Sequence, residues 1–515
     1  MSGLPLHTLT DVWLNTVGKF PHKTALVMDG QRYTYRALDE DIARLAGWLH
    51  ALGVRPGDRV AVAMPNCREF YLAYWATLRV GAILAPVNHR LGENEMTYVF
   101  NNIEPKVTFI HGEVWNSVEP AVPAASHFIG VGGAQWEGAR QDAVEPFEAA
   151  LAAGEPIAPV PVETEAIAII AHTSGTTGVP KGALMRHADL LFNIKNTVIP
   201  FSWRHEDTNL LLVPLFHVVG LYSVVPSSVY LGATVVVAPR PDPREVVELM
   251  ERERVTNFLS VPTFHHLVTG LPDIAERDLT SLRMIGYSGS PMPVRTIERL
   301  AELFPHARLH NFFGLTETIS LTHITPANAA VSHAHSIGKT IPDVGMKILR
   351  DDGSDCDFNE VGILHIHREN TIRGYWNRPE LLQKAITADG QWFSTGDLAK
   401  VDEDGFVYLE GRQKEMIIVA GENVFALEVE RCILAMGGVK EVAVVGVPAT
   451  GVRAALGELV KAVIVLNEGA EVTLRDVKRH CMQSLASYKV PQIIEFREAL
   501  PRNPSGKVLK STLIT

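Results

Sequence analysis

A loop of ten residues, Thr173–Gly182, combines hydroxyl groups, glycines and a single lysine, Lys181. It follows an apolar run, Ala166–Ala171, that is typical of a buried strand. Glycines let backbone N–H groups approach an anion, hydroxyls donate further hydrogen bonds, and a lysine adds a mobile positive charge. The loop therefore predicts a polyphosphate site rather than a flexible connector. It is not a Walker A loop, because Gly182 stands where that motif has serine or threonine.

Two later stretches carry side chains that suit the rest of a nucleotide. In Asn311–Thr318 the aromatic residues and Gly314 can face adenine, and the carboxylate of Glu317 can hold Mg²⁺ that bridges phosphates. In Ser394–Asp397 a carboxylate after a glycine turn can accept hydrogen bonds from both hydroxyls of a ribose. Taken alone, each stretch has an ordinary alternative, a solvated glutamate or a turn cap.

Three further short motifs follow in the C-terminal fifth of the chain: Gly411–Lys414, Gly421–Val424 and Pro501–Lys507. Together with the earlier motifs, and in the same order, they resemble the adenylate-forming superfamily of acyl- and aryl-CoA synthetases, firefly luciferase and peptide-synthetase adenylation domains. The resemblance covers essentially the whole chain. It departs from the family pattern at Phe313, where the family has a tyrosine, so that the ring is kept and the hydroxyl is lost.

The resemblance implies a role for each motif residue. The residues implied in binding the nucleotide and the CoA channel are Thr173, Ser174, Gly175, Thr176, Thr177, Gly178, Ser288, Gly289, Ser290, Asn311, Phe312, Phe313, Gly314, Asp397, Arg412, Gly421, Glu422 and Asn423. The residues implied in catalysis are Lys181, His217, Thr316, Glu317 and Lys507, with Glu317 and Thr176 at the metal and Lys414 at a hinge. Without the resemblance, Lys507 would be read as an ordinary exposed surface charge.

The chemistry explains why these parts occur together. A carboxylate is a poor nucleophile toward an anionic triphosphate, so its attack on the α-phosphate needs alignment and charge neutralisation. The resemblance implies that Lys507 lies between the reactants, that pyrophosphate leaves, and that the acyl-adenylate then reacts with a thiol. The thiol needs the place of Lys507, so the small domain is expected to rotate about Lys414. The implied small molecules are ATP, Mg²⁺, coenzyme A and a carboxylic acid.

The acid itself is only partly constrained. His217 stands where peptide-synthetase domains have an aspartate for the substrate ammonium, which disfavours an α-amino acid. The run Phe216–Gly220 resembles halobenzoate-CoA ligases. No arginine falls among the expected pocket positions, which disfavours a dicarboxylic acid. We therefore expect an aromatic acid, with a medium- or long-chain fatty acid and a carrier-protein acceptor as alternatives. The expected pocket residues are His217, Val219, Gly220, Ser288, Phe312 and Ile319, although Val219 and Ile319 could equally be core.

Strands must place these motifs at one edge of a sheet. Apolar runs at Arg59–Met64 and Ala82–Val87 alternate with a helical segment, Glu69–Val80, which predicts βαβ units on a parallel sheet. A second α/β block follows the glycine-rich loop, and ligands are expected at the carboxyl ends of its strands. The weakly periodic segment Glu113–Glu163 is interpreted as connecting surface structure. The fold class is therefore α/β, with an AMP-binding domain over residues 1–411 and a small mobile α+β domain over residues 412–515.

Composition narrows the function classes. The 515 residues carry a net charge of −11 without a basic block, which disfavours nucleic acid and anionic membranes as partners. Four scattered cysteines fit neither a zinc site nor a disulfide framework. With no apparent secretory signal or membrane-length apolar run, we expect a cytoplasmic enzyme without stable membrane association, a homodimer being one allowed assembly. A luciferase-like oxygenase and a silent binding protein are the other classes, the latter disfavoured because Lys507 and Glu317 are both present.

Overall fold

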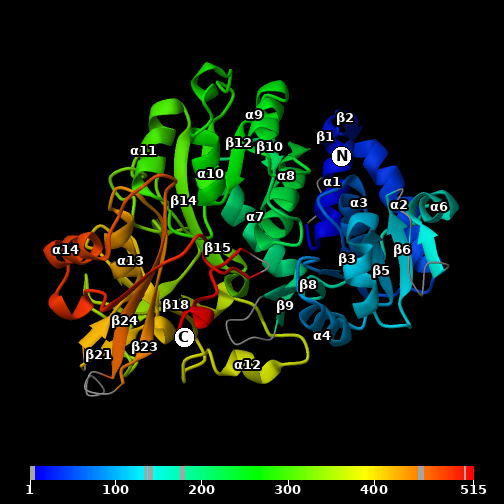
Figure 1. Cartoon of the computed structure of the whole chain (residues 1–515). Helices are drawn as coiled ribbons and strands as arrows, with labels where there is room; N and C mark the ends of the chain where they lie inside the picture. The colour runs from blue at the N-terminus through cyan, green and yellow to red at the C-terminus, as the bar shows by residue number, and fades with distance from the viewer. Residues whose placement is uncertain are drawn as a thin grey trace. The chain divides into compact units, whose positions relative to one another are not determined.

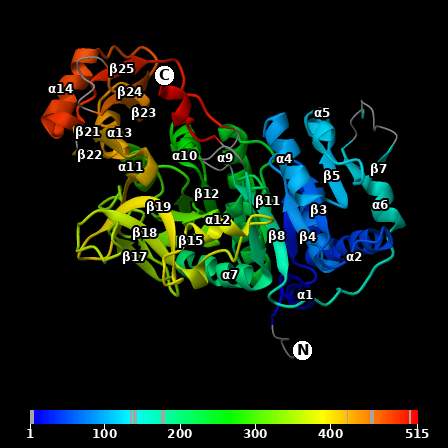
Figure 2. The ribbon, with the colours of Figure 1, turned by 90° about the horizontal axis from the view of Figure 1, so that it is seen from below.

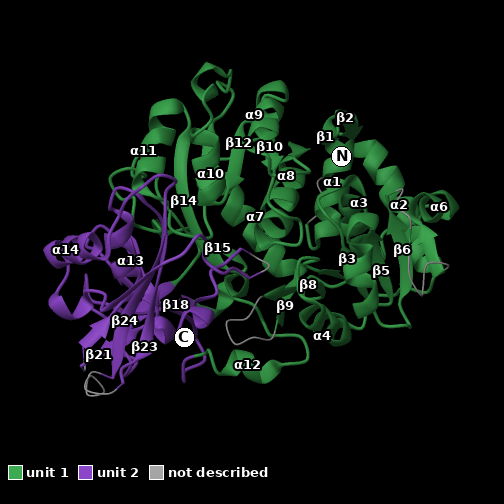
Figure 3. Ribbon diagram, viewed as in Figure 1, with its two compact units in different colours: residues 1–345, 367–386 green, residues 346–366, 387–515 purple. Residues whose placement is uncertain are grey.

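The computed structural model describes residues 6–132, 136, 143–173, 180–420, 422–450, 457–503 and 506–514. The chain forms two compact units (Figure 3). The first comprises residues 1–345 and 367–386, and the second comprises residues 346–366 and 387–515. The second unit thus begins before Arg412, where the composition of the sequence changes. The domain boundary predicted at residue 412 stays a prediction.

A seven-stranded sheet lies in the first unit, in the order β7-β6-β5-β3-β4-β8-β9 (Figure 1). All of its neighbouring strands are parallel except β8 and β9, which are antiparallel. Both strands predicted before the glycine-rich loop are present, as β3 and β4, and they are almost wholly buried, as parallel strands covered by helices should be. The strand bounds are β3 (Arg59–Ala63), β4 (Ile83–Pro86), β5 (Val107–His111), β6 (His127–Val131), β7 (Val144–Pro146), β8 (Ile167–Thr173) and β9 (Lys181–Arg186).

The interpretation of Glu113–Glu163 as connecting surface structure is wrong for much of that segment. It contains β6, β7 and the helix α6 (Phe147–Ala153), and β6 pairs in parallel with β5 along its whole length. Phe128 and Ile129 of β6 are buried, and Phe147 packs on Phe109 with ring centroids 6.1 Å apart. The strand has only five residues among alanines, prolines and glycines, so periodicity could not reveal it. Its burial depends on β5, which is a tertiary contact.

A nine-stranded sheet completes the core of the first unit, in the order β16-β15-β14-β13-β12-β10-β11-β1-β2. The sequence predicts a hairpin of Thr24–Met28 and Arg32–Tyr35 that turns at Asp29-Gly30. The structure contains this hairpin, and the φ values of 49° and 75° at the two turn residues suit a tight primed turn. This hairpin joins the sheet through parallel pairing of β1 with β11. The bounds are β1 (Thr24–Met28), β2 (Gln31–Thr34), β10 (Thr208–Leu211), β11 (Thr234–Val237), β12 (Asn257–Ser260), β13 (Met284–Tyr287), β14 (Arg308–Leu315), β15 (Ser320–Ile324) and β16 (Lys339–Thr340).

Helices of the first unit follow local signals in the sequence. In α9, Asp242 accepts hydrogen bonds from the N–H groups of Arg244 and Glu245, and Pro243 occupies the first helical position, where it costs no hydrogen bond. The helix bounds are α1 (Leu9–Lys19), α2 (Tyr35–Ala51), α3 (Arg68–Arg79), α4 (Glu93–Ile103), α5 (Trp115–Val118), α7 (His187–Phe201), α8 (Val225–Leu231), α9 (Pro243–Arg252), α10 (Pro262–Thr269), α11 (Val294–Leu303) and α12 (Pro379–Gln383). Within the described part of the chain, no helix has the length and apolarity needed to cross a membrane.

The second unit is built mainly from antiparallel strand pairs, with one parallel pair, β24 and β25, and it contains the helices α13 and α14 (Figure 2). The sequence predicts two helices and two strands here, and all four are present within a few residues of the predicted bounds: Leu427–Met436, Glu441–Val447, Val460–Leu466 and Leu474–Leu485. One sheet contains β17 (Met346–Leu349), β18 (Gly362–His367), β19 (Trp392–Val401) and β20 (Val407–Arg412). A hairpin, β21 (Ile417–Val419) with β22 (Glu422–Val424), precedes the sheet of β23 (Val439–Pro448), β24 (Glu458–Leu466) and β25 (Ile493–Phe496) and the helices α13 (Ala426–Leu434) and α14 (Leu474–Ser484). Val429, Ile433 and Cys481 of these helices are buried together with β23 and β24.

Candidate functional site

The glycine-rich loop connects the antiparallel strands β8 and β9, whose ends Thr173 and Lys181 lie opposite each other in register. Thr173 and Lys181 are both half-buried. The pairing fixes the two ends of the loop at the carboxyl end of β8, which is a parallel neighbour of β4. The remaining predicted phosphate-binding residues lie outside the described residues: Ser174, Gly175, Thr176, Thr177 and Gly178.

Glu317 lies in a single turn, Thr316–Thr318, between β14 and β15. The chain reverses there through the left-handed conformations of Ile319 (φ 57°) and Ser320 (φ 81°), and the N–H of Leu315 donates to the hydroxyl oxygen of Thr318 at 2.8 Å. The carboxylate is half-buried and accepts a hydrogen bond from the hydroxyl of Tyr375 at 2.9 Å. Tyr375 was not predicted, because neither its type nor its spacing distinguishes it in the sequence.

The aromatic cluster before Glu317 is held by its backbone and by packing. A Cβ at Gly314 would collide with the carbonyl oxygen of Ser320 in β15, so only glycine fits at this position of β14. Phe313 contacts His323 edge-on, with ring centroids 5.9 Å apart. Asn311 donates from its side-chain nitrogen to the carbonyl oxygen of Ser336 at 2.7 Å, which orients the amide.

The carboxyl ends of β12 and β13 lie beside Asn311, in the middle of β14. Tyr287 at the end of β13 is in register with Ser260 of β12 and with Asn311 of β14. The turn Ser288–Ser290 follows β13 directly, and Gly289 in it has a φ of 92°, which favours glycine. Both Gly289 and Ser290 are exposed. The sheet thus brings the 288–290 turn and the 311–314 stretch together at the carboxyl ends of parallel strands, the edge predicted to bind ligand.

The expected pocket residues differ in exposure. His217 follows β10 in an exposed turn, where its N–H donates to the carbonyl oxygen of Pro214 at 2.9 Å. Val219 is half-buried, Gly220 is buried, and Ile319 is only 2% exposed, as a core residue would be. Phe312 is buried against Phe201, with ring centroids 5.6 Å apart.

A π-helical segment, Val219–Val224, begins within the expected pocket. Such segments are rare and are often found at functional sites. A Cβ at Gly220 would lie 3.1 Å from the carbonyl oxygen of Pro214, so a glycine allows the segment to pass close to the turn before it. No repeat in the sequence indicates a π-helix, because hydrophobic residues continue through it.

In the second unit, Asp397 of β19 lies opposite Arg412 of β20, and their side chains form an ion pair at 2.9 Å between Oδ1 and Nε. Asp397 is 4% exposed, and its other oxygen, Oδ2, is buried without a hydrogen-bond partner. Burial raises the pKa of this carboxyl, and the Arg412 guanidinium opposes the rise. A buried acceptor without a donor is costly. The arrangement therefore fits a ligand that brings hydroxyl donors, as a ribose does.

The other predicted residues of the second unit are exposed. Lys414 lies in a short turn, Gln413–Glu415, directly after β20, and Glu422 and Asn423 lie on β22. Lys507 is held by a backbone turn in which its N–H donates to the side chain of Asn503 and its carbonyl accepts from the N–H of Asn503, both at 2.8 Å. The predicted Gly421 lies outside the described residues.

Lys510, three residues after Lys507, joins the C-terminus to the turn that contains Lys414. Its ammonium forms ion pairs with Glu415 at 2.9 Å and with Glu430 of α13 at 2.8 Å. Burial raises the pKa of Glu430, and Lys510 acts against that rise. The sequence offered no sign of this link, because the partners lie 80 and 95 residues away along the chain.

We expect Lys510→Met to destabilise the protein by about 3 kcal/mol, because Glu430 keeps a buried charge without its partner. The loss should be full near pH 8 and shrink toward pH 5, since the raised pKa lets Glu430 become neutral as the pH falls. Denaturant unfolding at both pH values measures the change. Adding Glu430→Gln should recover part of the loss at pH 8, and equal losses at the two pH values would contradict this role of Glu430.

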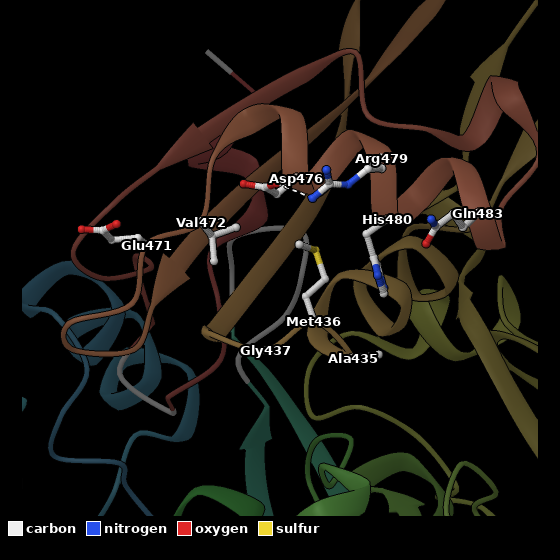
Figure 4. Close-up of a pocket in the computed structure, with 9 residues that line it drawn as sticks. All are labelled: Ala435, Met436, Gly437, Glu471, Val472, Asp476, Arg479, His480 and Gln483. Atoms are coloured by element: carbon white, nitrogen blue, oxygen red, sulfur yellow. Dashed lines mark hydrogen bonds and ion pairs between the residues drawn. The ribbon is translucent and has the colours of Figure 1, made fainter.

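A separate hollow of about 510 Å³ lies in the second unit, beside α14 (Figure 4). Asp476 and Arg479 in its wall form an ion pair at 2.6 Å, and His480 accompanies them. None of its lining residues belongs to the predicted motifs. The hollow is therefore not part of the candidate site.

The two α/β sheets of the first unit are typical of an enzyme that binds its ligand at the carboxyl ends of parallel strands. The AMP-binding enzyme family matches residues 14–376, and the AMP-binding enzyme C-terminal domain matches residues 428–507. The chain belongs to this adenylate-forming family and is an AMP-forming acyl/aryl-CoA ligase, with ATP and CoA as its small-molecule reactants alongside a carboxylic acid.

Its relatives span different acids. The chain is 33% identical over 482 residues to a long-chain-fatty-acid–CoA ligase of Mycobacterium tuberculosis, covering 94% of this chain and 92% of the relative. It is 31% identical over 497 residues to a feruloyl-CoA synthase of Amycolatopsis, covering 95% of each. The crystal structure of ATP-bound MatB from Rhodopseudomonas palustris is similar with a TM-score of 0.88 at 28% identity, covering 99% of this chain and 98% of that one.

Proposed function

We propose that this ligase activates an aromatic carboxylic acid. We further propose that some motif residues serve acyl-adenylate formation and others serve transfer of the acyl group to CoA. The observation that carries the substrate proposal is the apolar and aromatic character of the residues at the carboxyl ends of β10 and β14, above all the buried ring of Phe312. The feruloyl-CoA synthase similarity supports the same class. A fatty acid is the second candidate, favoured by the similarity to the long-chain-fatty-acid ligase.

The residues proposed to bind ATP first neutralise its negative charge. Lys181 and the loop amides would neutralise the phosphates, and Asp397 would accept the ribose hydroxyls through the oxygen that lacks a partner. Burial raises the pKa of the Asp397 carboxyl and Arg412 counteracts that rise, which favours the ionised carboxylate, the form that accepts from both hydroxyls. Phe313 would lie against adenine through its ring alone.

Glu317 fits a magnesium ligand. Its carboxylate is half-buried, one oxygen already accepts from Tyr375, and among the described residues no basic side chain forms an ion pair with it. Carboxylate oxygens are preferred ligands of Mg²⁺, and Thr176 is the second proposed ligand. When bound, Mg²⁺ would offset charge on the phosphates. Thr316, on the same turn, would donate its hydroxyl to a phosphate oxygen.

The proposed reaction has two steps, formation of the acyl-adenylate and formation of the thioester. Lys507 would neutralise both the attacking carboxylate and the α-phosphate, so that the carboxylate oxygen attacks phosphorus and pyrophosphate leaves. The CoA sulfur next attacks the acyl carbon, and AMP leaves with the electron pair of the broken C–O bond. His217, exposed after β10, would lie near the carboxylate in the first step. Glu422 and Asn423 would line the approach of the CoA arm.

Release of pyrophosphate tests the substrate proposal most directly. Purified protein is supplied with ATP and a panel of benzoates, cinnamates, medium-chain and long-chain fatty acids, each with and without CoA. The proposal requires the highest kcat/KM with an aromatic acid and a thioester product when CoA is present. A preference for long chains would establish the second candidate. A thioester product formed only when CoA is replaced by a carrier protein with a free thiol would establish that acceptor.

We expect Val219→Phe to raise KM for para-substituted benzoates and longer acids while benzoate is less affected. A ring at the start of the π-helical segment would shorten the pocket, and each excluded substituent is worth about 1–3 kcal/mol in discrimination. Val218→Phe is the matched control, because it makes the same change one residue earlier on another half-buried side chain. Equal losses of kcat/KM for small and large acids would show that Val219 belongs to the core.

A further inference from the structure

Tyr375 contacts two oppositely charged residues of the first unit. Its hydroxyl donates to Oε1 of Glu317 at 2.9 Å, and the ammonium of Lys181 lies 5.6 Å from the centroid of its ring. A cation at this distance is attracted by the ring. Tyr375 is only 6% exposed, so both contacts are made at a site largely shielded from water.

The backbone around Tyr375 is fixed at both ends. The N–H of Ile372 donates to the carbonyl oxygen of Glu317 at 2.9 Å, and the N–H of Trp376 donates to the carbonyl oxygen of Gly182, in β9, at 2.7 Å. Residues 372–376 therefore connect the turn that contains Glu317 with the strand that begins at the lysine. The position of the tyrosine ring is set by both elements.

The chemistry of this arrangement differs from that of an ion pair. A lysine and a glutamate so placed could bind each other and neutralise both charges, yet Lys181 and Glu317 do not form an ion pair with each other. The ammonium of Lys181 lies over the ring of Tyr375, and the hydroxyl of Tyr375 donates to the carboxylate of Glu317.

We propose that Tyr375 is a positioning residue that keeps Lys181 and Glu317 apart, so that both charges are available to a magnesium-bound polyphosphate. The inference rests on the proposed function of these two residues. It assigns the ring to the lysine and the hydroxyl to the carboxylate. Those two tasks can be removed one at a time.

Two substitutions separate the tasks. Tyr375→Phe keeps the ring and removes the hydroxyl, whereas Tyr375→Leu removes both. Tyr408→Phe is the matched control, because the Tyr408 hydroxyl also donates to a carboxylate, that of Asp402 at 3.1 Å, in the second unit. Calorimetric titration gives the dissociation constant of ATP with Mg²⁺ and of ATP with EDTA for each variant, and thermal unfolding without ligand reports on the fold.

The phenylalanine variant should bind magnesium-ATP on the order of ten-fold more weakly, since a hydrogen bond to a charged group is lost, while metal-free ATP binding stays unchanged. The leucine variant should weaken metal-free ATP binding as well, by about three-fold, because Lys181 loses the ring and can pair with Glu317. Tyr408→Phe should change neither constant. Lower thermal stability with both dissociation constants unchanged would make Tyr375 purely structural and overturn the proposal.

Lys181→Ala and Glu317→Gln separate this inference from the proposed function. If neither variant weakens magnesium-ATP binding, the assignment of those residues to the polyphosphate is wrong, and the role of Tyr375 falls with it. If both weaken binding and Tyr375→Phe does not, only the positioning role is overturned. Equal metal-free ATP affinities of the phenylalanine and leucine variants would overturn the part of the proposal that assigns the ring to Lys181.

Discussion

Lys507→Ala should slow acyl-adenylate formation by at least about 10²–10³-fold, the loss typical of removing one donor that stabilises a transition state. Thioester formation from supplied acyl-adenylate should be largely spared, because that step is proposed to need a thiol where the lysine was. Lys507 is an exposed residue, and its turn is held by bonds from its backbone to Asn503, so we expect the substitution to leave the fold intact. Pyrophosphate release and thioester formation are measured separately.

Lys440→Ala is the matched control for this experiment, because Lys440 is also exposed and lies in the same unit, on β23. It should leave both half-reactions unchanged. Equal losses of the two half-reactions in Lys507→Ala would show that one arrangement of the chain serves both. In that case the proposed exchange of lysine and thiol would be wrong.

Lys414→Pro should leave pyrophosphate release measurable and stop transfer to CoA. Proline holds φ near about −65° and restricts the preceding residue, so the turn Gln413–Glu415 could no longer adopt a second backbone conformation. Single-turnover measurement should show acyl-adenylate accumulating when ATP and acid are added with CoA. Lys414 is exposed, so the effect should come from its backbone.

Lys414→Ala tests that last point, since it removes the same side chain while φ stays free. The alanine variant should transfer the acyl group at close to the normal rate. If the proline variant also turns over normally, the hinge does not lie at residue 414. If both variants fail in transfer, the side chain of Lys414 is what the second half-reaction needs.

Much of the fold was predictable because its strands are short apolar runs with clear ends. The Asp29-Gly30 turn, β3, β4 and the helices α13 and α14 all follow from local propensity and period, and the structure has them within a few residues. One strand that was not predicted, β6, is buried through its pairing with β5, which is distant from any local signal in the sequence. The pairing of β1 with β11 could not be predicted either, since the two strands lie some 210 residues apart along the chain.

The sequence by itself determined the family and the residues of each motif, because glycines, hydroxyls, Lys181, Glu317 and Lys507 are recognised by type and spacing within short stretches. Only the tertiary structure decided which groups hold them. Tyr375 meets Glu317 across 58 residues, and Lys510 meets Glu415 across 95. No local pattern in the sequence identifies such partners, since a tyrosine or a lysine in a loop is common. The role of Tyr375 or Lys510 arises only when folding places a charged group next to it.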